Sequence, residues 1–147
     1  MNSQETAQAL MDAVQRGDFD KAKTLLTEDF RFNGLVRRPI NGRIWLRLGA
    51  SLRMAFNGLN YHFKVESTEG NVVNTTSQMS GNNRGAFDLT GLRMGVISAT
   101  NRDFSTPMEK IKITVRDGKV SSWVVKPTEG AGLMAILKQL GVKVPAI

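Results

Sequence analysis

The spacing of the apolar residues changes near Tyr61, from a helical to a strand period, and that change sets the fold class. Over about residues 3–16, apolar side chains recur at i, i+3, i+4 and i+7, the period of one stripe along an α-helix. From Tyr61 onward, apolar and polar residues alternate instead, as they do on a half-buried strand. The chain is therefore predicted to be α+β, with N-terminal helices packed across a curved, largely antiparallel sheet.

Local end signals predict three further helices. Asp18 can cap a short second helix, and Asn41 can cap a third over about residues 42–57. A last helix, over about residues 131–140, is predicted to end at Gly141. The C-terminal part of the chain is therefore expected to close with a helix.

Strands are expected at residues 30–32, 61–66, 72–80 and 109–115. The stretch from Gly81 to Phe104 is rich in Asn, Gly, Thr and Arg and shows no regular period. No internal repeat or low-complexity linker divides the chain. Residues 1–147 are therefore predicted to form a single domain.

Asp117-Gly118 is the strongest hairpin signal in the sequence, because both residues suit the turn of a two-residue loop. Uninterrupted pairing would place Val115 opposite Val120 and continue outward to Ile111 opposite Val124. The outer face would then carry Lys112, Trp123 and Val125. Apolar residues on an outer face favour association, so a homodimer through this face is one hypothesis.

The formal net charge is +7, and the bases are concentrated in one block. Between Asp29 and Glu66 there is no acidic residue, but there are seven Lys and Arg residues. Such a block can attract phosphate or carboxylate groups. However, no basic run is interleaved with stacking aromatic residues. A solvated face is the preferred interpretation, and nucleic acid is not expected as a partner.

Three absences in the sequence exclude classes of function. With no cysteine there is no disulfide, thiolate nucleophile or cysteine-bound metal. No window approaches about 18 uninterrupted apolar residues, so no membrane-spanning helix is expected. The first residues lack the pattern of a secretion signal. A cytoplasmic location is therefore expected.

The order of these elements resembles the nuclear-transport-factor-2-like superfamily, and more narrowly its SnoaL-like, polyketide cyclase-like branch. The resemblance covers nearly the whole chain. It is carried by four stretches, namely Gly17-Asp18-Phe19-Asp20 leading into residues 25–30, the helix from Gly42 to Phe56, residues 115–120, and Gln139-Leu140-Gly141. It implies a cone-shaped domain in which a curved, mixed sheet wraps the N-terminal helices around an apolar cavity.

A strongly coiled sheet packed on helices cannot fill its middle completely, and such gaps suit ligands. The first hypothesis is therefore a protein that binds a small apolar or polycyclic molecule in this cavity, without a cofactor. The expected lining residues are Phe32, Trp45, Phe63, Met79 and Met94.

The resemblance also implies an alternative, because the superfamily includes polyketide cyclases, ketosteroid isomerases and an epoxide hydrolase. Such enzymes use a carboxylate with a raised pKa as general acid or base. SnoaL-like cyclases usually carry an Asp just before the last helix, and this sequence lacks it there. The candidates are therefore Glu129, at that place, and Asp88 and Asp103 in the irregular segment.

His62 is the only histidine, and the alternation places it on the face opposite Tyr61 and Phe63. It is therefore expected on the surface. A lone histidine without cysteines or clustered carboxylates also argues against a metal site. Three hypotheses stay open on sequence grounds: a ligand-binding pocket protein, a cyclase or isomerase, and a dimeric interaction module.

Overall fold

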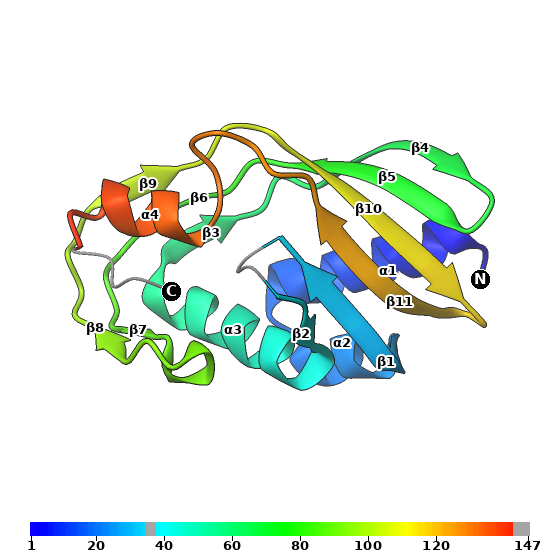
Figure 1. Ribbon diagram of the computed structural model, residues 1–147, viewed down its shortest axis with the longest axis horizontal. Coiled ribbons are helices and arrows are strands. Elements are labelled where there is room, and N and C mark those ends of the chain that lie inside the picture. The colour runs from blue at the N-terminus through cyan, green and yellow to red at the C-terminus, as the bar shows by residue number, and fades with distance from the viewer. Residues whose placement is uncertain (35–37, 143–147) are drawn as a thin grey trace.

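The computed structural model describes residues 1–34 and 38–142, and its first three helices lie together beneath a long, curved sheet (Figure 1). The predicted α+β class is confirmed. The helices are α1 (Ser3–Arg16), α2 (Phe19–Thr24), α3 (Gly42–Ala55) and α4 (Leu133–Gln139). α4 lies apart from the other three, at the opposite end of the molecule from the hairpin (Figure 1).

The helices begin where their capping residues predict. Asn2 accepts a hydrogen bond from the backbone N–H of Glu5 at 2.8 Å, and the Glu5 carboxylate accepts one from the Asn2 backbone. Asp18 and Asn41 cap α2 and α3 in the same way through one backbone N–H each. Gly17 ends α1 with φ of 76°, in the left-handed region that favours glycine.

The main sheet has six strands in the order β2-β1-β11-β10-β5-β4. Its strands are β1 (Leu26–Asn33), β2 (Ile40–Asn41), β4 (Lys64–Glu69), β5 (Val72–Ser77), β10 (Glu109–Arg116) and β11 (Lys119–Val125). β1 pairs with β11 in parallel and every other described pair in this sheet is antiparallel, so the sheet is mixed. α1 packs against β5, β10 and β11, which places the core between the helices and this inner face.

The segment predicted to be irregular, from Gly81 to Phe104, contains short elements, and its two ends join a second sheet with a strand that precedes β4. β3 (Asn57–Asn60), β6 (Ser80–Asn82) and β9 (Asp103–Ser105) form a second sheet, and β7 (Phe87–Asp88) pairs with β8 (Val96–Ile97). A 3-10 turn, η1, spans Thr90–Leu92. The buried side chain of Asn83 holds this region together by hydrogen bonds to the backbone of Ala55, Gly85 and Thr100.

The hairpin register differs from the prediction after its first pair. Val115 lies opposite Val120 as predicted, but Ile113 lies opposite Trp123 and Ile111 opposite Val125. The register shifts because Ser121 is an extra residue in β11, a β-bulge that reverses the facing of every residue beyond it.

This bulge corrects the predicted outer face. Trp123 is 3% exposed and points inward, and Val125 is half-buried on the same inner side. Lys112 stays exposed on the outer side, where its neighbour on β11 is Val124. The apolar outer face predicted from Trp123 and Val125 is therefore wrong, and the homodimer based on it stays a prediction.

The strand predicted from Tyr61 begins three residues later, at Lys64. The backbone between β3 and β4 is irregular, with His62 in the left-handed region at φ of 47°. Tyr61 and Phe63 nevertheless face the same way, with ring centroids 4.9 Å apart and planes 5° from parallel. His62 is exposed, and its Nδ1 lies 2.6 Å from the carbonyl oxygen of Gln78.

Within residues 1–34 and 38–142, no helix is long and apolar enough to cross a membrane.

Candidate functional site

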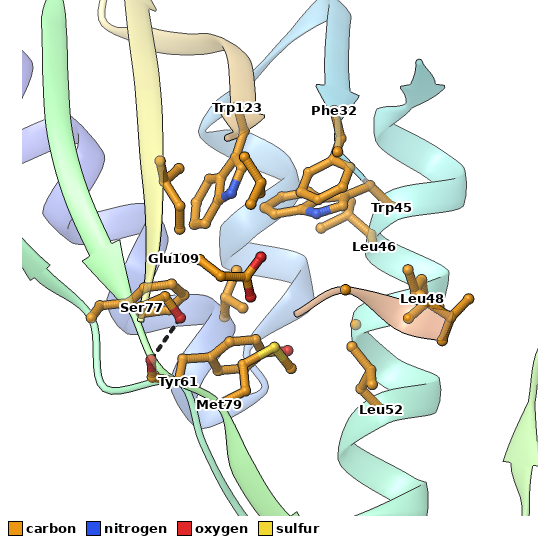
Figure 2. A pocket seen from close by; sticks show the side chains of 18 of the residues that line it. Phe32, Trp45, Leu46, Leu48, Leu52, Tyr61, Ser77, Met79, Glu109 and Trp123 are labelled. Atoms are coloured by element: carbon orange, nitrogen blue, oxygen red, sulfur yellow. Dashed lines mark hydrogen bonds between the residues drawn. The ribbon is translucent and has the colours of Figure 1, made fainter. Parts of the chain in front are cut away.

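A cavity of about 100 Å³ lies between α3 and the inner face of the main sheet (Figure 2). Its walls come from α1, α2, α3 and α4, from four strands of the main sheet, and from the segments that flank β4 and β5. The lining residues are Val14, Phe19, Phe32, Gly34, Trp45, Leu46, Leu48, Gly49, Leu52, Tyr61, Phe63, Ser77, Met79, Glu109, Ile111, Trp123, Val125, Gly132, Leu133 and Ile136. Nearly all of these side chains are apolar.

Five aromatic rings form a continuous arc along the cavity wall. Phe32 and Trp45 have centroids 5.8 Å apart, and Trp45 lies 5.1 Å from Trp123. The arc continues from Trp123 to Phe63 at 5.6 Å, and from Phe63 to Tyr61 at 4.9 Å. These separations are within the range of favourable aromatic pairs, so the rings hold one another in place.

The arc forms because strand register, a helix cap and a β-bulge each position one or more of its rings. Phe32 and Trp123 are register partners on the parallel strands β1 and β11, so both point to the inner face. Trp45 lies in the first turn of α3, which the Asn41 cap positions over β1. The bulge at Ser121 is what turns Trp123 into the arc.

One acidic side chain enters this apolar space. Glu109 is the first residue of β10, opposite Ser77 on β5, and it is 9% exposed. Figure 2 shows its carboxyl group among the rings of Trp45, Trp123 and Tyr61. Burial raises the pKa of this carboxyl above its ordinary value. Within the described residues, no side chain forms an ion pair with it.

Two other polar side chains line the cavity. The Ser77 hydroxyl donates a 2.7 Å hydrogen bond to the backbone oxygen of Tyr61, shown as the dashed line in Figure 2. Burial also raises the pKa of the Tyr61 hydroxyl, so it stays neutral and can donate. The cavity therefore offers an apolar wall with a small number of polar groups, as ligand sites commonly do.

The structure places four of the five predicted lining residues at this cavity. Phe32, Trp45, Phe63 and Met79 are among the residues that line it. Met94 is not, because it follows η1 in the segment on the far side of α3, where it is half-buried.

None of the three predicted carboxylates enters the cavity, because Asp88, Asp103 and Glu129 are all exposed at the surface. Asp88 accepts hydrogen bonds from the backbone N–H and the hydroxyl of Thr90, which lower the pKa of its carboxyl. Asp103 accepts a 2.8 Å hydrogen bond from the Asn82 amide. Their positions follow from short surface elements that the sequence pattern did not resolve.

The carboxylate that does enter the cavity was missed. Glu109 lies on the inner face of β10, the same face as Ile111, Ile113 and Val115, all of which are buried. Burying an acidic side chain costs free energy unless the carboxylate is paired or hydrogen-bonded, so acids are rare at such positions. An acidic residue at an apolar position of the strand pattern is the sequence signal that points to this site.

Several solved structures share this fold at low sequence identity. A candidate polyketide cyclase from Xanthomonas campestris is 18% identical, with a TM-score of 0.69, covering 94% of this chain and 96% of its own. A candidate SnoaL-like polyketide cyclase from Jannaschia is 21% identical, with a TM-score of 0.70, covering 97% and 93%. An LEH-like epoxide hydrolase from Mycobacterium tuberculosis is 16% identical, with a TM-score of 0.61, covering 95% and 92%.

No family model matches the sequence, and no curated protein is a significant match. At identities this low, the structural similarity establishes the fold and leaves the activity to be argued from the site. The chain has the nuclear-transport-factor-2-like fold, in the form that SnoaL-like polyketide cyclases share, as its sequence predicted.

Proposed function

We propose that this protein binds a small, largely apolar molecule in the cavity between α3 and the main sheet. The observation that carries the proposal is the arc of five aromatic rings around a single buried carboxylate. Transfer of an apolar ligand from water to this apolar wall would be favourable in free energy. A polar atom on the ligand would face Glu109, which gives the site a means of orienting it.

The volume limits the size of that molecule. At about 100 Å³, the cavity is smaller than the roughly 300–1,000 Å³ of pockets that enclose drug-sized ligands. An engineered apolar cavity of about 150 Å³ binds benzene. The ligand that fits this conformation is therefore one small ring or a short branched chain. A polycyclic ligand would require the wall to open, and α4 supplies Leu133 and Ile136 to that wall.

Nuclear magnetic resonance can test binding, because the only two tryptophans both line the cavity. A ¹H–¹⁵N spectrum has one indole signal from Trp45 and one from Trp123, assigned by replacing each with Phe. Titration with toluene, phenol or 2-naphthol is expected to shift both signals, most strongly with the one-ring compounds. If none of the three compounds moves either indole signal, the proposed function fails.

Matched variants of α4 locate the binding. Ile136 lines the cavity and is 4% exposed, whereas Met134 lies on the outer side of the same helix and is 38% exposed. Ile136→Phe adds volume to the cavity wall and is expected to weaken binding at least tenfold. Met134→Phe makes a comparable change outside and is expected to leave affinity unchanged. Equal effects of both substitutions would place the bound compound elsewhere.

A second candidate function is acid–base catalysis by Glu109, in the manner of a cyclase or isomerase. It is supported by the buried position of the carboxyl and by its raised pKa, both of which suit a general acid or base. Glu109 takes the role that Glu129, Asp88 and Asp103 were expected to fill. The structural neighbours described as candidate polyketide cyclases make this chemistry worth testing.

Proton exchange at a small ketone tests the second candidate without knowledge of the natural substrate. Cyclopentanone in D₂O exchanges its α-protons when a base removes them, and the exchange is followed by ¹H resonance. The protein is expected to accelerate exchange above buffer, and Glu109→Gln is expected to abolish the acceleration. Glu129→Gln, the same chemical change at an exposed site, is the control and should retain it. Equal rates for Glu109→Gln and the unmodified protein would exclude Glu109 as the base.

A further inference from the structure

The ionisable residue at the cavity is an acid, although the protein as a whole is basic. The whole chain carries 20 Lys and Arg residues and a formal net charge of +7. Yet among the described residues no Lys or Arg lines the cavity, and Glu109 is the one acid that does. A site for an anionic ligand would place bases against it. The cavity walls therefore disfavour an anion.

The aromatic arc also favours a cation over an anion. The face of an aromatic ring carries partial negative charge, so it attracts a cation placed against it, most strongly where water is excluded. Five such rings form the arc, and Trp45 and Trp123 belong to the residue type that binds cations best. Aromatic cages of this composition are a known means of binding quaternary ammonium groups.

Glu109 supplies the third observation. A buried carboxylate is normally paired with a cation or with several hydrogen-bond donors. Here it is 9% exposed and faces a cavity whose described walls offer no base. Its missing partner is either a proton or a positively charged group that arrives with the ligand.

We propose that the ligand of this cavity is a small organic ammonium cation, held between the aromatic arc and the carboxylate of Glu109. The inference rests on the proposed ligand-binding function and names its ligand class. The volume of about 100 Å³ suits a group of the size of trimethylammonium with a short substituent. Because the ammonium supplies the charge that the walls lack, bound Glu109 would be ionised and paired.

This arrangement predicts how binding depends on pH. The cation pairs with the ionised carboxylate, so affinity rises as pH increases through the pKa of Glu109, which burial has raised. Among the lining residues, Tyr61 is the only other group that titrates, and burial raises the pKa of its hydroxyl further. The lining residues from α1, α2, α3, α4, β1, β5 and β11 add no titratable or charged side chain.

The test compares two molecules of the same shape and different charge. Choline carries a quaternary nitrogen, and 3,3-dimethyl-1-butanol carries a neutral carbon in its place. Both are titrated into the protein at about pH 5 and about pH 8 while the two indole signals are followed. Because choline does not titrate in this range, any pH dependence comes from the protein. Glu109→Gln and the exposed control Glu129→Gln complete the set.

Choline is expected to bind about tenfold or more tightly than its neutral analogue at pH 8. The advantage should shrink at pH 5, shrink to the part that the aromatic rings supply in Glu109→Gln, and persist in full in Glu129→Gln. Equal or tighter binding of 3,3-dimethyl-1-butanol overturns the inference and leaves the proposed function standing. An advantage that Glu109→Gln leaves unchanged overturns it as well, and so does binding of toluene or phenol without any binding of choline. If no compound moves either indole signal, the inference and the proposed function fall together.

Discussion

Replacing Glu109 with Gln should change how the stability of this protein depends on pH. The substitution keeps the size and shape of the side chain and removes its ability to ionise. Burial raises the folded-state pKa of Glu109 above its unfolded value, which is about 4.3 for an ordinary glutamate. The folded protein therefore prefers the protonated form, and ionisation costs stability.

The sign and size of the effect follow from linkage. Protonated Glu109 contributes its full stability below the unfolded pKa, and this contribution is lost as pH rises through the folded pKa. Because one proton is involved, the difference in the free energy of unfolding between the unmodified protein and Glu109→Gln changes by at most about 1.4 kcal/mol per pH unit. Below the unfolded-state pKa and above the folded-state pKa, this difference is constant. The free energy of unfolding of Glu109→Gln therefore rises relative to that of the unmodified protein as pH increases from the unfolded-state pKa through the raised folded-state pKa.

Urea unfolding followed by circular dichroism measures this gap at each pH, and Glu129→Gln serves as the control at an exposed site. The control is expected to show no comparable pH-dependent gap. A gap for Glu109→Gln that is constant from pH 4 to 8, or that favours the unmodified protein as pH rises, would refute the buried position of this carboxylate.

Changes at three further positions test how the fold positions the site. Deleting Ser121 removes the bulge and leaves Val120 and Trp123 two residues apart, a spacing that keeps both on the inner face of a regular strand, so tryptophan emission should stay unchanged; a red shift of the emission, with Trp123 exposed to solvent, would contradict the register. Asn83→Ala breaks fully buried hydrogen bonds and should lower the free energy of unfolding by roughly 3 kcal/mol, whereas a loss below about 1 kcal/mol would show that these bonds matter little. Asn41→Ala removes the cap of α3 and should cost about 1 kcal/mol in urea unfolding, while Asn41→Asp, which can still cap, should cost less.

The helices could be predicted from sequence because their determinants are local. The observed α1 spans the predicted residues 3–16, and α3 ends two residues before the predicted boundary. Each start is set by a side chain that bonds within three residues, so no knowledge of the rest of the fold was needed. The resemblance of element order then sufficed for the fold.

The register of β11 could not be predicted from the turn alone. A two-residue loop fixes the first pair, Val115 with Val120, and says nothing of an insertion further along. A signal was nevertheless present, because Val120 and Trp123 are three residues apart and cannot share one face of a regular strand. Both are buried, and the extra residue between them reconciles the two.

The site itself depends on contacts between segments that are distant in sequence. Phe32, Trp45, Phe63 and Trp123 were each visible as apolar residues, but their assembly into one arc needs the parallel pairing of β1 with β11. The predicted carboxylates came from the position before the last helix and from the irregular segment, whereas Glu109 lies at the start of a regular strand. An acid within an apolar alternation was the more direct physical clue.

The central claim is that the arc of aromatic rings encloses space that a ligand can occupy. Xenon diffuses into apolar cavities of this kind, so a crystal of the protein pressurised with xenon tests the claim without assuming a ligand class. The account predicts a xenon atom in the space bordered by Trp45, Trp123 and Leu52. Diffraction data that show no xenon in this space would contradict it.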